Sequence, residues 1–190
     1  EKAMRNDTIV AKYSYLADGT KLSAVNADDC GFAYRGSFTY RMDAEANRVF
    51  ESTPFGGGRI VGTVDDETEV RYFLTDHLGS IRVVADASGS VVQRNHFYPF
   101  GLSFADNENP ETQPYKFNGK ELDLFHGLNW YDYLARGMDP AAGRFTAIDP
   151  LCEKYFALSP YVFCANNPVN YIDPDGKIIK IANNRVNALT

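Results

Sequence analysis

The feature that most constrains this chain is a loosely repeated unit of two short strands joined by a turn. The first unit is the alternating aromatic stretch 13–15, followed by Asp18-Gly19 and a return strand that ends at Leu22. Side chains that alternate with a period of two are typical of a β-strand, and Asp-Gly is a preferred hairpin turn. Similar units begin at Phe38, Arg71 and Asn129. Because one such unit cannot bury its faces alone, we expect the units to join into a continuous sheet.

The clearest hairpin lies between Ser80 and Arg94, where two β-branched runs flank a turn at 86–89. It predicts a meander of strands over residues 69–104. The glycine run 56–58 predicts a bulge or bend, and residues 121–125 are the best candidate for a helix of one or two turns. Composition favours an all-β chain, because the 12 tyrosines and 13 phenylalanines prefer strands while the 15 glycines and 9 prolines interrupt them.

The charge and the cysteines exclude several classes of function. A formal net charge of −6 argues against a nucleic-acid-binding surface, which needs excess positive charge. No apolar run approaches the roughly 20 residues of a membrane-spanning helix. The three cysteines lack a C-x-x-C spacing, so we expect free thiols, no metal site and no disulfide framework. No motif predicts a cofactor. The chain begins with Glu1 and has no leader pattern, so we expect it to be a fragment of a longer protein.

A series of short motifs, taken in order, resembles the Rhs repeat-associated core domain that ends proteins built from Tyr-Asp (YD) repeats. Each motif alone is weak, and the ordered set is specific. The resemblance covers most of the chain and is strongest over residues 69–177. The series contains Asp76-His77-Leu78-Gly79, Tyr98-Pro99-Phe100-Gly101, Phe117-Asn118-Gly119-Lys120-Glu121, Tyr131-Asp132-Tyr133, Asp149-Pro150, Asn166-Asn167-Pro168 and Asp173-Pro174-Asp175-Gly176.

The resemblance implies a fold and a task. Proteins of this kind, including the C component of Tc toxins, roll a strip of β-hairpins into a hollow shell around a C-terminal toxin. On this basis we expect YD-repeat strands over residues 1–68, a turn-rich core domain over 69–177 and the stub of a variable region over 178–190, packed as a strand against the core or held inside the shell. The main partner would be the chain's own C-terminal effector. Secretion machinery or a surface partner could also bind the protein. The parent protein would be secreted or displayed at the cell surface.

The resemblance also implies a site for cutting the chain. Members that cut themselves use the aspartates of two Asp-Pro pairs with an upstream arginine, which correspond here to Asp149, Asp173 and Arg136. The scissile bond would join Lys177 to Ile178. Aspartyl-type cleavage needs one carboxyl group protonated while the other activates a nucleophile, a division that closely spaced carboxylates favour.

A structural interpretation of the same residues stays open. Asp-Pro pairs also end strands and start turns, and Asp139-Pro140 is a third pair with no catalytic counterpart. The chain departs from the cleaving members at 151–153, where glycine is usual, and at Lys177, where an apolar residue is usual. The sequence therefore leaves two possibilities, an intramolecular aspartyl protease or a set of structural turns.

Other candidate sites have weaker patterns. His77 fits a turn better than an acid–base or metal pair, because His96 and His126 do not lie at metal-ligand spacing from it. Ser80 and Ser159 lack the setting of a nucleophile. The aromatic residues fit core and cross-strand pairs better than a stacking platform. A platform is nonetheless the basis of the alternative function, a cell-surface module that binds carbohydrate or protein without catalysis.

Overall fold

The computed structural model describes residues 2–5, 7–63, 65, 67–104, 109, 113–124 and 127–182, and it is all-β, as predicted. The helical segments within these ranges include three 3-10 turns of three residues each, η1 (Phe117–Gly119), η3 (Cys152–Lys154) and η4 (Cys164–Asn166). In the part of the chain that the structure describes, no helix has the length and apolar character needed to cross a membrane.

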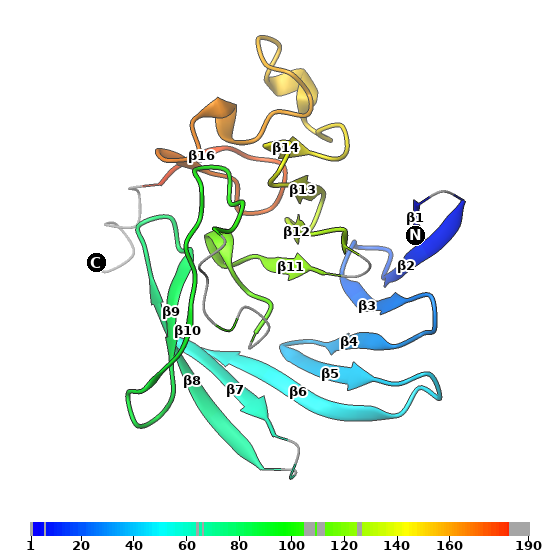
Figure 1. The fold of residues 1–190 in the computed structure, drawn as a ribbon. Coiled ribbons are helices and arrows are strands. Elements are labelled where there is room, and N and C mark those ends of the chain that lie inside the picture. Colours follow the sequence, from blue (N-terminus) through cyan, green and yellow to red (C-terminus); the bar gives the residue numbers. More distant parts are fainter. Residues whose placement is uncertain are drawn as a thin grey trace. The chain divides into compact units, whose positions relative to one another are not determined.

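The largest sheet has ten strands whose order in the sheet is their order in the chain. Figure 1 shows strands β2 to β6 following one another through short turns. This arrangement is the continuous sheet of hairpins that the repeated unit predicts. Its strands are β1 (Lys2–Arg5), β2 (Thr8–Tyr15), β3 (Lys21–Asn26), β4 (Gly31–Arg35), β5 (Phe38–Met42), β6 (Arg48–Phe55), β7 (Gly58–Gly62), β8 (Thr68–Thr75), β9 (Ile81–Ala85) and β10 (Val91–Arg94).

Aspartate side chains make several of the turns between these strands. In the turn after β9, the Oδ1 atom of Asp86 accepts hydrogen bonds from the backbone N–H groups of Ser88 at 2.8 Å and Ser90 at 3.0 Å. Gly89 takes a φ of +85° there, which glycine adopts at little cost. The predicted turn at 86–89 is therefore confirmed. The meander ends at Arg94, earlier than predicted, because residues 95–104 contribute an isolated bridge between Phe97 and Ser103 instead of a strand.

The glycine run between β6 and β7 forms a two-residue turn. Phe55 pairs with Gly58, so Gly56 and Gly57 span the connection. A Cβ atom at Gly58 would overlap the carbonyl oxygen of Arg71 on β8. Glycine is needed here because two backbones approach closely, which is one of the uses of glycine in a sheet.

The chain divides into two compact units, each with its own buried residues. The first comprises Glu1–Phe73, Val84–Val91 and Leu124–Leu128, and the second comprises Leu74–Val83, Val92–Asp123 and Asn129–Thr190. The buried residues of the first unit's sheet are mostly small apolar side chains. They include Val10, Ala11, Ala24, Val25 and Ala33.

The second unit contains two further small sheets. One has the order β11-β12-β13-β14, and the other pairs β15 with β16. The prediction of a helix over residues 121–125 is wrong, because Glu121–Asp123 is a strand that pairs with Trp130–Asp132. A segment of so few residues gains too little from helical hydrogen bonds to resist pairing with a neighbouring strand. The strands are β11 (Glu121–Asp123), β12 (Trp130–Asp132), β13 (Gly137–Asp139), β14 (Arg144–Phe145), β15 (Tyr171–Ile172) and β16 (Lys180–Ile181).

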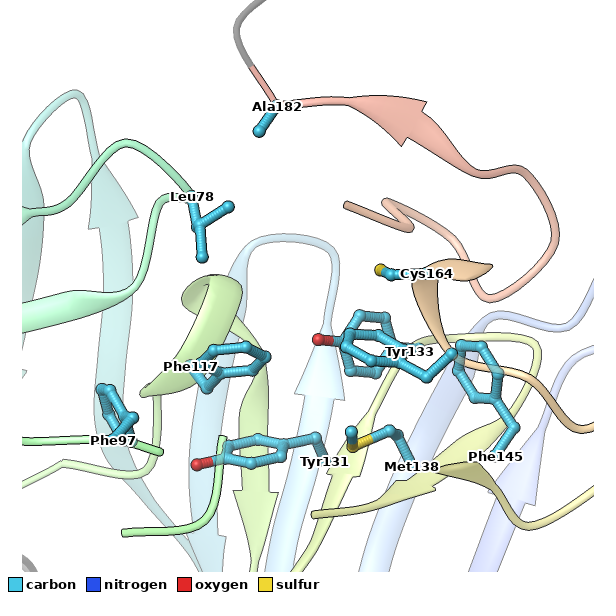
Figure 2. Close-up of a cluster of buried hydrophobic side chains, with 10 residues drawn as sticks. Leu78, Phe97, Phe117, Tyr131, Tyr133, Met138, Phe145, Cys164 and Ala182 are labelled. Atoms are coloured by element: carbon cyan, nitrogen blue, oxygen red, sulfur yellow. The ribbon is translucent and has the colours of Figure 1, made fainter. Parts of the chain in front are cut away.

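Aromatic rings fill the core of the second unit (Figure 2). The ring of Tyr133 lies 5.6 Å from that of Phe145 and 5.4 Å from that of Phe163, in edge-to-face geometry. Such pairs stabilise a core beyond the area that they bury, by about 0.5–1.5 kcal/mol each. The buried cluster consists of Leu78, Phe97, Phe117, Tyr131, Tyr133, Met138, Phe145, Phe163, Cys164 and Ala182.

The first part of the C-terminal segment packs as a strand against the core. Lys180–Ile181 pairs with Tyr171–Ile172, and Ala182 belongs to the buried cluster. The remaining residues, 183–190, lie outside the described ranges.

Candidate active site

Arg136 enters the interior of the second unit from the turn between β12 and β13. Leu134 has a φ of +70°, and its N–H donates to the Oδ1 atom of Asp132 at 2.7 Å. The N–H of Tyr133 donates to the carbonyl of Arg136 at 3.0 Å and closes the turn. The guanidinium group is thereby carried inward, and the side chain is 1% exposed.

The guanidinium group of Arg136 reaches three separate segments of chain. Its Nε atom donates to the carbonyl of Gly176 at 2.6 Å, its NH1 atom to the carbonyl of Pro160 at 3.0 Å and its NH2 atom to Oδ2 of Asp149 at 2.9 Å. The ring of Phe145 covers one face, with its centroid 3.7 Å from Cζ. Burial lowers the pKa of Arg136, and the neighbouring Asp149 and Asp173 oppose that shift.

Asp149 is the carboxylate that pairs directly with Arg136. Its Oδ2 atom accepts from the guanidinium group, and its Oδ1 atom accepts from the N–H of Leu151 at 2.7 Å. The second contact is the turn expected of an Asp-Pro pair, so Asp149 serves as turn residue and as ion-pair partner at once. Both carboxyl oxygens of Asp149 thus accept a hydrogen bond.

Asp173 has a different environment on the other side of the same guanidinium group. Its Oδ1 atom accepts from the N–H groups of Gly176 at 2.8 Å and Lys177 at 3.1 Å. Its Oδ2 atom is buried, has no hydrogen-bond partner among the described residues and lies 3.6 Å from NH2 of Arg136. Burial raises the pKa of Asp173, although the backbone N–H groups and Arg136 act in the opposite direction.

The three residues named from the sequence thus meet at one buried place. Arg136 NH2 lies within ion-pair distance of both Asp149 and Asp173. Asp149 has the stronger charged contact, whereas burial favours the protonated form of Asp173. A pair of carboxyl groups whose environments differ in this way suits one as base and the other as acid.

The expected scissile bond lies on the exposed segment that leaves this site. Lys177 and Ile178 are exposed, and their N–H groups donate to Oδ1 of Asp175 at 3.1 and 3.2 Å. The preceding carbonyl, that of Gly176, is the one gripped by Arg136. Gly176 has a φ of +74°, and a Cβ atom there would lie 2.8 Å from the carbonyl oxygen of Tyr133. The segment is therefore held tightly up to residue 176 and becomes exposed at 177.

No protein-family model matches the chain. Toxin subunit YenC1 from Yersinia entomophaga is 30% identical over 112 residues, covering 57% of this chain and 11% of that protein. Salivary gland surface protein 1 from Aedes aegypti is 42% identical over 107 residues, covering 55% of this chain and 3% of that protein. Among solved structures, the Tc holotoxin pore of Photorhabdus luminescens matches 96% of this chain with a TM-score of 0.75 and 23% identity. The chain is therefore similar to Rhs and Tc-toxin-type proteins.

The chain spans only a small part of the length of the proteins that it matches. It spans 3% and 11% of the two curated relatives and 9% of the solved chain. At 23% identity the structural likeness shows the fold, an all-β arrangement shared with a Tc toxin component.

Sequence reasoning missed three contributors to the site. Pro160 and Gly176 act through backbone carbonyls, which no side-chain pattern reveals. Lys120 donates to the carbonyl of Pro174 at 2.6 Å. The signal for Lys120 was its place in the ordered motifs, directly after the Asn118-Gly119 turn.

The other candidates take part in backbone hydrogen bonds. The Nε2 atom of His77 lies 3.0 Å from the carbonyl of Val169, and Oγ of Ser80 accepts from the N–H of Asn118 at 3.0 Å. Oγ of Ser159 accepts from the N–H of Tyr161 at 3.3 Å. His126 lies outside the described residues.

The described residues contain neither a metal-binding cluster nor a disulfide. Over those ranges, no group of three or more His, Cys, Asp or Glu side chains is arranged to hold a metal ion. Cys164 is buried and Cys30 and Cys152 are half-buried, all as free thiols.

Proposed function

We propose that this chain is the C-terminal shell and plug segment of an Rhs-type toxin, and that it cuts its own chain once, between Lys177 and Ile178. In this proposal residues 1–68 belong to the hairpin strip, 69–177 form the core domain and 178–190 begin the variable region. The observation that carries it is the buried pair of Asp149 and Asp173 on one guanidinium group, with Oδ2 of Asp173 lacking a hydrogen bond among the described residues.

The proposed reaction is hydrolysis of one peptide bond. Asp149, as the carboxylate, takes a proton from a water molecule whose oxygen adds to the carbonyl carbon of Lys177. The bond from that carbon to the nitrogen of Ile178 then breaks, and the nitrogen takes a proton from Asp173. Solvent exchange returns both carboxyl groups to their starting state. The products are a carboxyl group on Lys177 and an amino group on Ile178.

Arg136 has a positioning role in this proposal. Its contact with the carbonyl of Gly176 holds the chain one residue before the bond that breaks, and its contact with Asp149 holds that carboxyl group in place. Positioning of reacting groups is a large part of enzymatic rate enhancement, and small displacements reduce it strongly.

The proposed partner is the effector that follows residue 177 in a longer parent protein. The support is the similarity to a relative whose name is a toxin subunit. Encapsulation by a shell of hairpins, release after cleavage, and secretion or surface display of the parent all belong to the proposal.

A second candidate is a cell-surface module that binds carbohydrate or protein without catalysis. Two observations favour it. One relative is a salivary gland surface protein, and the first unit leaves aromatic side chains exposed on β5, β6 and β8. These side chains are Phe38, Phe55 and Tyr72.

The test of self-cleavage is the intact mass of the purified chain. Under denaturing conditions we expect the wild type to appear as two pieces, residues 1–177 and 178–190, whereas Asp149→Asn and Asp173→Asn stay intact, because an amide neither takes up nor releases the required proton. The matched control is Asp139→Asn, which changes the third Asp-Pro pair and should leave cutting unchanged. A folded wild type that keeps its full mass, like all three variants, would remove the catalytic part of the proposal and favour the binding module.

A further inference from the structure

Lys120 is held in place by a tight turn before its side chain reaches the candidate site. Asn118 and Gly119 take φ values of +51° and +68°, and the N–H of Lys120 donates to the carbonyl of Phe117 at 2.9 Å. The side-chain amide of Asn118 donates to the carbonyl of Leu78 at 3.2 Å. The backbone of Lys120 is therefore fixed from both sides of the turn.

The Lys120 side chain ends on the second Asp-Pro pair. Its Nζ atom donates to the carbonyl of Pro174 at 2.6 Å and lies 5.2 Å from the centroid of the Tyr133 ring. Tyr133 is itself fixed, because it is fully buried and its hydroxyl donates to Oδ1 of Asn118 at 2.6 Å. An ammonium group above a buried ring and at a carbonyl has little freedom to move.

The charges around Lys120 are those of the candidate site. Burial lowers the pKa of Lys120, while Asp132, Asp173 and Asp175 raise it. The electrostatic energy of a pair acts on both members, so the ammonium group also favours the ionised form of Asp173. The charged and titratable groups around Asp173 come from several elements. They are Arg136 from the turn before β13, Asp149 on the same guanidinium group, Lys120 after η1, Asp175 in its own turn, Tyr133 after β12 and Cys164 in η4.

We propose that Lys120 is a positioning residue for the carboxyl pair: its ammonium group fixes the Pro174 carbonyl and thereby holds Asp173 against Arg136. The proposal rests on the proposed self-cleavage for its effect on rate. Lys120 touches neither the scissile bond nor a reacting oxygen. It acts through the turn 173–176, whose other fixed point is the contact between Arg136 and the carbonyl of Gly176.

Three substitutions test the role of the Lys120 ammonium group. Lys120→Met removes the donor and the charge, Lys120→Arg keeps both, and Lys154→Met removes an exposed lysine of η3 as the matched control. Cleavage is followed by intact mass from pH 4 to pH 9 after refolding. If Lys120→Met fails to fold, Lys120→Gln takes its place, since it keeps a shorter polar donor without the charge.

The expected result has two parts. Lys120→Met should cut about tenfold more slowly than the wild type, and its rate should fall at a pH about one unit higher, because Asp173 then keeps its proton longer. Lys120→Arg and Lys154→Met should follow the wild type. A wild-type rate and profile in Lys120→Met would overturn the proposal, and so would slow cutting with an unshifted profile in both Lys120 variants.

Failure of the proposed function gives a different pattern. If the wild type is never cut, the carboxyl group of Asp173 is titrated by NMR in the uncut wild type and in Lys120→Met. A titration midpoint of Asp173 that rises by about one pH unit in the variant would retain Lys120 as the group that positions Asp173. An unchanged midpoint would overturn that role independently of cleavage.

Discussion

The guanidinium group of Arg136 and the carboxylate of Asp149 meet at 2.9 Å inside the second unit, with side chains only 1% and 9% exposed. The contact joins the turn after β12 to the Asp-Pro turn that follows β14. Removal of one member of such a pair leaves a buried charge without its partner, which costs more than the pair itself contributes.

Arg136→Met should therefore lower the free energy of unfolding by about 3–5 kcal/mol. The measurement is denaturant unfolding of the folded variant beside the wild type. Arg144→Met is the control, because Arg144 is exposed on β14 and its loss should change stability by no more than about 0.5 kcal/mol. Equal stability of Arg136→Met and the wild type would mean that the ion pair does not hold the site together.

Asp173 predicts a dependence of stability on pH. Its pKa in the fold is raised above the ordinary value of 3.8, so its contribution to stability is fully present below that value and is lost as pH rises through the folded pKa. Asp173→Asn stays neutral and keeps an Oδ1 acceptor for the N–H groups of Gly176 and Lys177. Its stability relative to the wild type should therefore improve as pH rises from about 4 to about 8. Denaturant unfolding across this range is the measurement, and a stability difference that stays constant with pH would contradict it.

Ala165 lies in the middle of η4 with φ +51° and ψ +34°, a left-handed conformation that is unfavourable for a residue with a Cβ atom. Ala165→Gly should raise the free energy of unfolding by about 0.5–1 kcal/mol. This value is the backbone strain that is relieved, reduced by the greater conformational freedom of glycine in the unfolded chain. Ala157→Gly, at an exposed position without a positive φ, should not stabilise the chain. Thermal unfolding of both variants tests the difference.

Two glycines with similar backbone angles separate strain from steric overlap. At Gly176, where φ is +74°, an added Cβ atom would lie 2.8 Å from the carbonyl oxygen of Tyr133, whereas at Gly89, where φ is +85°, it would meet open space. Gly89→Ala should lose about 1–2 kcal/mol from strain alone. Gly176→Ala should lose more and should also slow any cutting, because the turn 173–176 must shift. The measurement is denaturant unfolding, and equal losses at the two positions would show that the neighbourhood of Gly176 yields easily.

The hairpin sheet could be predicted from the sequence because its determinants are local. Alternating strands joined by a turn with an aspartate, as at Asp86, specify a hairpin within about fifteen residues. The error at residues 121–125 has the opposite cause. The fate of that segment depends on Trp130–Asp132, a strand that only the folded chain brings beside it.

The candidate site could be predicted only in part. Arg136, Asp149 and Asp173 were named through a resemblance, and nothing in their separation along the chain places them at one guanidinium group. The carbonyls of Pro160 and Gly176 and the reach of Lys120 arise from tertiary packing, which leaves no pattern in side-chain types.

Ala182 gives the proposed cut an unusual outcome. It lies five residues beyond Lys177, is 3% exposed within the aromatic core, and donates its N–H to the carbonyl of Asn170 at 2.8 Å. A break at Lys177–Ile178 would therefore divide the core between two polypeptides and leave both halves packed together. Cleavage would break the covalent connection, but the downstream piece would stay bound until the core of the second unit opens.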